Sequence, residues 1–271
     1  MVRFAVLGGL RRGTTFLQSL IKSHRRVKMF GEILNLGIVD DLARKRIITD
    51  STQYLEREVF KWRYWLFRAV GFKVLYDQLN YACLIRFYRN IYEHYPLHPG
   101  YRQRIEFVIR QIEECGTERY APNLERLGNY LKGFRILHLK RNNKLEVLLS
   151  CLRAMRSDQW IVVKNASRGF LPLMKLEYED CVNFFTMAEE CEMRFDSFFK
   201  GPDVLEIVYE DLLSHRDREM KRVLSFLDLP DQNLFTPYIK NKKCPIAQEL
   251  SNYHSLKREF GQSKWSVYFQ E

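Results

Sequence analysis

A glycine-rich loop near the N-terminus constrains the fold more than any other feature of the sequence. Residues Gly8–Thr15 read G-G-L-R-R-G-T-T and directly follow the apolar run Phe4–Leu7. The glycines have the G-x-x-x-x-G spacing of a phosphate-binding loop, but Thr14 stands where such a loop carries its lysine. Because that lysine contacts the β- and γ-phosphates, its replacement points to a nucleotide other than a phosphoryl-donating ATP or GTP.

The segments around this loop suit an anion site. Val2–Leu7 predicts a buried strand, and Thr14–His24 has the apolar spacing of an amphipathic helix. A glycine turn exposes consecutive N–H groups, and the start of the helix adds unpaired N–H groups and a positive dipole. The spacing alone would also fit a tight turn and a helix cap. The residues that we expect to bind phosphate here are Arg11, Arg12, Gly13, Thr14 and Thr15.

Strands and helices are predicted to alternate along the rest of the chain. The expected strands, or in the first case a strand exit, are residues 30–34, 72–76, 134–139 and 204–208, and the expected helices are 55–70, 142–155, 176–199 and 216–227. This alternation predicts an α/β fold with a central, mostly parallel sheet flanked by helices. We expect one domain over residues 1–271, with residues 81–130 as helices joined by loops, inserted on the substrate side.

Charge and composition narrow the class of ligand. Lys and Arg number 44 against 33 Asp and Glu, a net charge of +11, which favours an anionic ligand. No nucleic-acid-binding motif accompanies this charge, so nucleic acid is not the expected partner. The six cysteines are scattered without a C-x-x-C pair, which is typical of reduced thiols in a cytoplasmic protein, and we expect no metal site. We expect no signal peptide and no run of the ~18 apolar residues that a membrane span needs.

Two motifs resemble those of a known enzyme family. R-R-G-T-T-F-L, residues 11–17, resembles the 5′-phosphosulfate loop of sulfotransferases that use 3′-phosphoadenosine 5′-phosphosulfate (PAPS). Arg11 takes the family's basic position, and Arg12 replaces its usual serine. Residues 137–154 are similar to the 3′-phosphate motif, with Arg141 and Ser150 as the matching pair, one residue further apart than in cytosolic members. Asn143 and Arg153 are therefore kept as further contacts.

Two weaker matches lie nearer the C-terminus. V-Y-E-D-L, residues 208–212, resembles a family segment that precedes a basic helix, and it places Tyr209 among the expected nucleotide contacts. The tail from N-Y-H-S-L-K to K-W-S-V-Y-F is similar to the closing segment of bacterial and carbohydrate members. The resemblance implies a fold related to the P-loop kinases and PAPS as co-substrate. It implies no metal, because the loop arginines can do the work of Mg²⁺.

The resemblance also implies catalytic roles in sulfuryl transfer to a hydroxyl or amine of a small-molecule, carbohydrate or lipid acceptor. We expect Glu32, in G-E-I-L, to be the general base. Arg11 is the first candidate for the cation that stabilises the transferring group, and Lys73, in G-F-K-V-L-Y-D-Q-L, is the second. His138, inside a predicted strand, is expected to be a core histidine.

Two other functions fit the same loop. One is a P-loop kinase or NTPase with an altered loop, which would need Mg²⁺ and an acidic residue to hold it. The other is a non-enzymatic nucleotide- or nucleic-acid-binding module, whose polynucleotide binding would depend steeply on salt. The sequence leaves the acceptor and the oligomeric state open.

Overall fold

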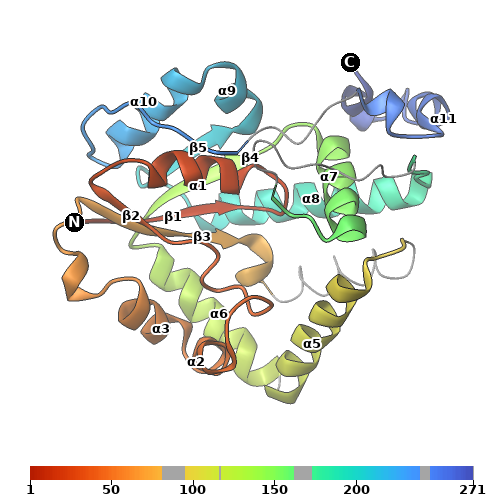
Figure 1. Cartoon of the computed structure of the whole chain (residues 1–271). Helices are drawn as coiled ribbons and strands as arrows, with labels where there is room; N and C mark the ends of the chain where they lie inside the picture. The colour runs from red at the N-terminus through yellow and green to blue at the C-terminus, as the bar shows by residue number, and fades with distance from the viewer. Residues whose placement is uncertain (81–94, 116, 162–172, 239–244, 271) are drawn as a thin grey trace.

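A parallel β-sheet forms the centre of the molecule (Figure 1). The computed structural model describes residues 1–80, 95–115, 117–161, 173–238 and 245–270. Within them the sheet has five strands in the order β2-β3-β1-β4-β5, and every pair is parallel. The strands are β1 (Val2–Gly8), β2 (Val27–Met29), β3 (Ala69–Leu75), β4 (Arg135–Lys140) and β5 (Val204–Val208). The expected α/β fold with a parallel sheet is confirmed.

Helices cover both faces of this sheet (Figure 1). Phe4 and Val6 of β1 point to one face, where they pack with α1 (Thr14–Lys22), α9 (Tyr209–Ser214) and α10 (Arg216–Phe226). Ala5 and Leu7 point to the other face, because side chains alternate along a strand. That face is covered by α2 (Asp41–Thr49), α3 (Ser51–Glu58), α6 (Thr117–Leu131) and the end of α8 (Tyr178–Phe198).

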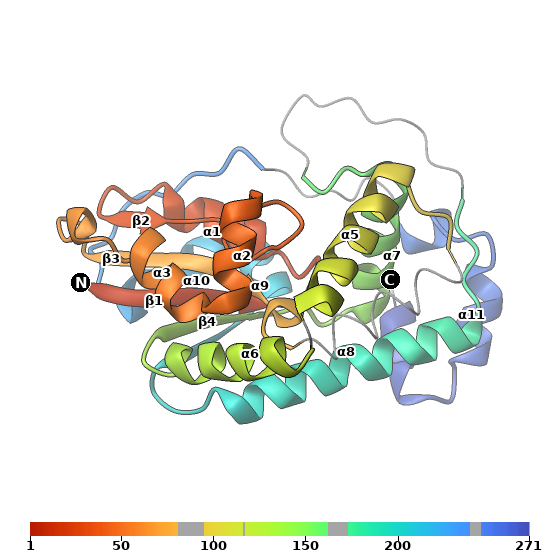
Figure 2. The same ribbon diagram turned by 90° about the horizontal axis from the view of Figure 1, so that it is seen from below.

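A third apolar cluster lies beyond one end of the sheet. It combines α5 (Pro99–Cys115), α7 (Lys144–Ser157) and α8 with the C-terminal elements η3 (Ile246–Gln248), α11 (Tyr253–Glu259) and η4 (Lys264–Phe269). Figure 2 shows α5, α7 and α11 at the end of the molecule opposite the N-terminus. Parallel strands bring their carboxyl ends to one edge, so this cluster stands next to the edge where α/β proteins bind ligands.

The segment between α2 and β3 differs from the sequence-based expectation. The helix predicted over 55–70 is wrong: α3 ends at Glu58, a short 3-10 turn η1 (Trp62–Tyr64) follows, and β3 already begins at Ala69. Its aromatic residues suggested a helix, but Trp62 and Trp65 are exposed, so no buried helical face forms. Residues 30–34 are likewise not a strand. Strand β2 ends at Met29, and residues 30–34 form the loop that follows it, which agrees with the alternative expectation of a strand exit.

The predicted insertion is largely helical where it is described. Residues 99–115 form α5 and residues 117–131 form α6, whereas residues 81–94 and 116 lie outside the described residues. None of the helices in the described part of the chain is long and apolar enough to cross a membrane.

Candidate active site

A cavity of about 860 Å³ opens at the carboxyl ends of the central strands. The loop after β1, the loop after β2, the end of β3, and α5 and α7 form its walls. Of the residues that the sequence proposed for catalysis or nucleotide binding, all but Arg12 and Asn143 line it: Arg11, Gly13, Thr14, Thr15, Glu32, Lys73, Arg141, Ser150, Arg153 and Tyr209.

The loop after β1 leaves no room for a side chain at Gly13, the last glycine of the G-x-x-x-x-G spacing. Gly13 adopts φ +95°, and a Cβ there would overlap the ring of Tyr209. The preceding Arg11 is also left-handed, with φ 59°. Helix α1 begins at Thr14 without a side-chain cap. Its first turn and the loop therefore face the cavity as a ready anion site.

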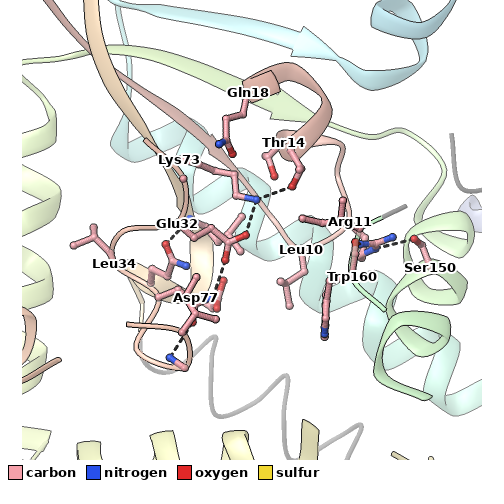
Figure 3. A pocket seen from close by; sticks show the side chains of 18 of the residues that line it. Leu10, Arg11, Thr14, Gln18, Glu32, Leu34, Lys73, Asp77, Ser150 and Trp160 are labelled. Carbon is pink, nitrogen blue, oxygen red and sulfur yellow. Dashed lines mark hydrogen bonds and ion pairs between the residues drawn. The ribbon is translucent and has the colours of Figure 1, made fainter. Parts of the chain in front are cut away.

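One wall of the cavity carries an ammonium held between the loop and an acid (Figure 3). Lys73 Nζ donates to Thr15 Oγ1 at 2.8 Å and pairs with Glu32 Oε1 at 2.5 Å, although only 4% of Lys73 is exposed. Asn35 Nδ2 donates to the second Glu32 oxygen at 2.7 Å. The strand end that carries Lys73 thus joins the phosphate loop to the proposed base.

Asp77 lies on the same wall and was not foreseen. Burial, and then the neighbouring Glu32, raise the pKa of the Asp77 carboxyl to about 7. Asp77 follows β3 by two residues, in the same G-F-K-V-L-Y-D-Q-L segment as Lys73. Its position just beyond the carboxyl end of a parallel strand was the signal that could have found it.

The opposite wall carries Arg11 beside Ser150 and Trp160 (Figure 3), with Arg141 next to it. Arg11 Nε donates to Ser150 Oγ at 2.9 Å, and its guanidinium also donates to the Trp160 carbonyl. Arg141 donates to the Arg11 carbonyl at 3.2 Å, and its guanidinium lies 4.9 Å from the centre of the Tyr209 ring. Burial lowers the pKa of Arg11, which marks a cation held in a setting poor in water.

One atom of this wall points to an anionic ligand. Arg141 Nε is buried and has no hydrogen-bond partner among the described residues, although Glu146 pairs with the same guanidinium. Leaving such a donor unpaired costs free energy, and a phosphate oxygen would satisfy it. The residues present therefore fit a nucleotide with a phosphate on this side.

Arg12 departs from its expected role as a ligand contact. Only 3% of the residue is exposed, its guanidinium forms an ion pair with Glu192 of α8, and it is absent from the cavity lining. Lys144 of α7 pairs with the same Glu192 carboxylate at 2.7 Å. Arg12 follows the left-handed Arg11, and its side chain enters the interior instead of the cavity. The geometry favours a structural role for this side chain.

Of the other three residues singled out in the sequence, Arg153 lines the cavity, whereas Asn143 and His138 do not. Asn143 caps α7, since its Oδ1 accepts the Glu146 N–H at 3.0 Å, and it does not line the cavity. Arg153 lines the cavity and pairs with Glu249 at 3.3 Å. His138 lies in the interior, with its ring nitrogens 2.5 Å from the Tyr76 hydroxyl and 3.2 Å from Asp196. Burial lowers the pKa of His138 to about 4, which suits the expected core histidine.

Comparison with known proteins identifies the family. The sequence model of the sulfotransferase family matches residues 4–233, from β1 past α10. The chain belongs to the sulfotransferase family. The match includes the phosphate loop, Glu32, Lys73 and the Arg141–Ser150 pair.

Curated relatives cover nearly the whole chain. It is 24% identical to Nodulation protein H of Rhizobium meliloti over 269 residues, which are 98% of this chain and 94% of the relative. It is 23% identical to Nodulation protein H of Rhizobium tropici, over 98% of this chain and 92% of the relative. Family membership supports sulfuryl transfer as the activity of this transferase. Among the residues that the structure describes, no group of three or more His, Cys, Asp or Glu side chains could hold a metal ion.

Proposed function

We propose that this sulfotransferase moves a sulfuryl group from PAPS to a hydroxyl or amine of a small-molecule, carbohydrate or lipid acceptor. One observation carries the proposal: a single cavity holds a phosphate loop, an arginine–serine pair and a lysine–glutamate pair. The first two suit the two anionic ends of PAPS, and the third suits proton removal from an acceptor.

The nucleotide would bind across the loop and the arginine wall. The N–H groups at the start of α1, with Thr14 and Thr15, suit the 5′-phosphosulfate. Arg141, Ser150 and Arg11 suit the 3′-phosphate, because Arg11 contacts Ser150 directly and Arg141 keeps a free donor among the described residues. A guanidinium fork is well matched to phosphate oxygens.

The other wall would carry the chemistry. Glu32 takes the proton of the acceptor's hydroxyl or amine while the acceptor's oxygen or nitrogen bonds to sulfur. At the same time the bond between sulfur and the bridging phosphate oxygen breaks, which leaves adenosine 3′,5′-bisphosphate (PAP). Lys73 lies between Thr15 and Glu32, so it is the cation best placed to neutralise the charge on the leaving oxygen. We therefore assign this role to Lys73 and give Arg11 to nucleotide binding.

The acceptor would enter along the apolar side of the cavity. Helices α5 and α6 contribute Tyr101, Ile105, Val108 and Tyr120 to the lining, together with Leu34 and Leu36 of the loop after β2. Aromatic and aliphatic walls with few polar groups are typical of sites for small organic molecules. This arrangement supports the substrate-side role expected for the segment that contains α5 and α6.

Binding and turnover experiments test the proposal. We expect PAP to raise the melting temperature without metal, and labelled PAPS to transfer its label to a member of a panel of alcohols, sugars, lipids and amines. A larger shift with ATP and Mg²⁺ than with PAP would favour the altered P-loop kinase. Nucleotide binding without transfer to any acceptor would favour a non-enzymatic module.

A further inference from the structure

Three large apolar side chains stand exposed in the turn between α3 and β3. Trp62, Trp65 and Leu66 are 84%, 67% and 73% exposed, within the segment K-W-R-Y-W-L-F-R of residues 61–68. Single exposed apolar residues are common, but two tryptophans and a leucine within five residues form a patch that normally serves binding. We call these three residues the tryptophan patch.

Basic side chains surround the tryptophan patch. Arg63 stacks on Tyr64 with its guanidinium 5.1 Å from the ring centre, and Lys28 Nζ lies 5.3 Å from the same ring. The Arg68 N–H donates to the Arg26 carbonyl at 2.9 Å, which brings the exposed Arg25–Arg26 turn alongside.

Nearby acids are already neutralised by other basic groups. Glu58 pairs with Lys61 at 2.8 Å and with Arg46 at 3.9 Å. Asp228 pairs with Arg135 at 2.6 Å, and this pair, with a smaller effect of the charge on Arg68, lowers the pKa of the Asp228 carboxyl. The surroundings of the tryptophan patch are therefore positively charged.

The tryptophan patch is separate from the candidate active site. It directly precedes β3, whose first residue is Ala69, whereas Lys73 and Leu75 at the other end of β3 line the cavity. Seven residues of strand at ~3.3 Å each span roughly 20 Å. Figure 2 shows this turn at the end of the sheet marked by the N-terminus, away from α5 and α7.

We propose that the tryptophan patch binds the surface of an anionic lipid bilayer. Tryptophan favours the boundary between acyl chains and headgroups, a leucine beside it can enter the acyl region, and flanking arginines and lysines attract anionic headgroups. Nucleic acid would satisfy the arginines but offers Leu66 no apolar contact. A symmetric pairing of two copies would press one basic surface against its equal. On a bilayer, the cavity would face the water from which a charged nucleotide arrives.

Vesicle binding tests this proposal. We expect the protein to sediment with vesicles of phosphatidylcholine mixed with phosphatidylglycerol, and not with phosphatidylcholine alone, and to lose binding as salt rises. The chain has four tryptophans, and Trp160 and Trp265 are half-buried, so a blue shift of emission on binding would come mainly from the patch.

Two variants and two controls sharpen the test. W62A/W65A and the charge reversal R26E/R63E should each lower vesicle binding at least tenfold. The controls are L173A/M193A, which removes exposed apolar groups elsewhere, and K257E/R258E, which reverses exposed charges on α11; both should bind as the parent does. PAP-induced thermal stabilisation should be unchanged in all four, which separates this test from that of the proposed function.

Several results would overturn the proposal. They are no binding to anionic vesicles, equal binding to neutral vesicles, or binding that survives W62A/W65A. A patch-dependent dimer without vesicle binding, or tighter patch-dependent binding to RNA than to vesicles, would assign these residues to another partner.

Discussion

At the scale of single residues, the chemistry of the site depends on contacts between its charged side chains. Lys73 contacts both Thr15 and Glu32, so one ammonium serves the donor loop and the proposed base. Asp77 stands near the same pair with a raised pKa. The roles of Glu32, Arg141 and Asp77 can be separated, because substitution of each predicts a change in a different measured quantity: turnover, nucleotide affinity and the pH dependence of stability.

Glu32→Gln should retain nucleotide binding and lose turnover. The amide keeps the size of the side chain but cannot accept the acceptor's proton, so we expect kcat to fall by roughly 10²–10⁴-fold. PAP-induced thermal stabilisation should stay close to that of the parent. Asn35→Ala, which removes the amide beside Glu32 and its hydrogen bond from the Gly37 N–H but leaves the carboxylate, is the control and should cost far less turnover. Unchanged turnover in Glu32→Gln would remove Glu32 from the role of base.

Arg141→Ala should weaken the binding of PAP much more than that of AMP, which lacks the 3′-phosphate. Charge-assisted hydrogen bonds contribute about 1.5–3 kcal/mol, so we expect the Kd for PAP to rise by roughly 10- to 100-fold. Titration calorimetry with both nucleotides measures the difference. Arg153→Ala, on the same wall, gives the comparison. Equal losses for PAP and AMP would place the 3′-phosphate elsewhere.

Asp77 should make stability depend on pH. Its pKa is raised from 3.8 to about 7, so between these values the folded state holds a proton that the unfolded chain has lost. The contribution of Asp77 to stability is therefore full below pH 3.8 and is lost as pH rises to about 7. We expect Asp77→Asn to flatten this slope and to exceed the parent's stability at about pH 8. Denaturant unfolding across this range measures it, and parallel slopes in both proteins would contradict the assignment.

At the scale of elements, the junction of β1 and α1 combines a strained loop with close packing. Gly13 needs a left-handed backbone and has the Tyr209 ring against it, so two independent costs oppose any side chain. Gly201 offers a comparison, because it has φ +105° but nothing within 4 Å of where its Cβ would lie.

Gly13→Ala should therefore cost more stability than Gly201→Ala. The left-handed backbone alone costs about 1–2 kcal/mol in either variant. Overlap with Tyr209 adds at least about 1 kcal/mol at residue 13, the usual cost of overpacking. Urea unfolding of both proteins measures the difference. Equal free energies of unfolding would mean that Tyr209 moves aside without cost.

Local patterns in the sequence predicted the elements that form from neighbouring residues. The strand, the glycine loop and helix α1 are contiguous, and β4 and α7 carry apolar periodicity, so each was visible in a short window. The turn at residues 61–68 was misjudged because its aromatic composition resembles that of a buried helix, and exposure depends on the rest of the fold.

At the scale of the whole molecule, the parallel sheet brings distant segments to one edge. Glu32, Lys73 and Arg141 follow or end different strands, and their convergence around one cavity comes from the shared strand direction. The sequence resemblance placed these residues in one site. It could not show that Arg12 pairs with Glu192, 180 positions away, because only tertiary packing brings α8 beneath the loop.

The pairing of Arg12 with Glu192 limits which residues positions 12 and 192 can carry together during evolution. Reverting Arg12 to the serine usual in the family would leave Glu192 with the Lys144 ammonium and without its guanidinium. The Glu192 side chain is only 13% exposed and would lose one of its two cations, so the reversion should cost less stability when residue 192 is neutral as well. Positions 12 and 192 are therefore epistatic. In related chains, we expect an arginine at position 12 to occur together with an acidic residue at position 192.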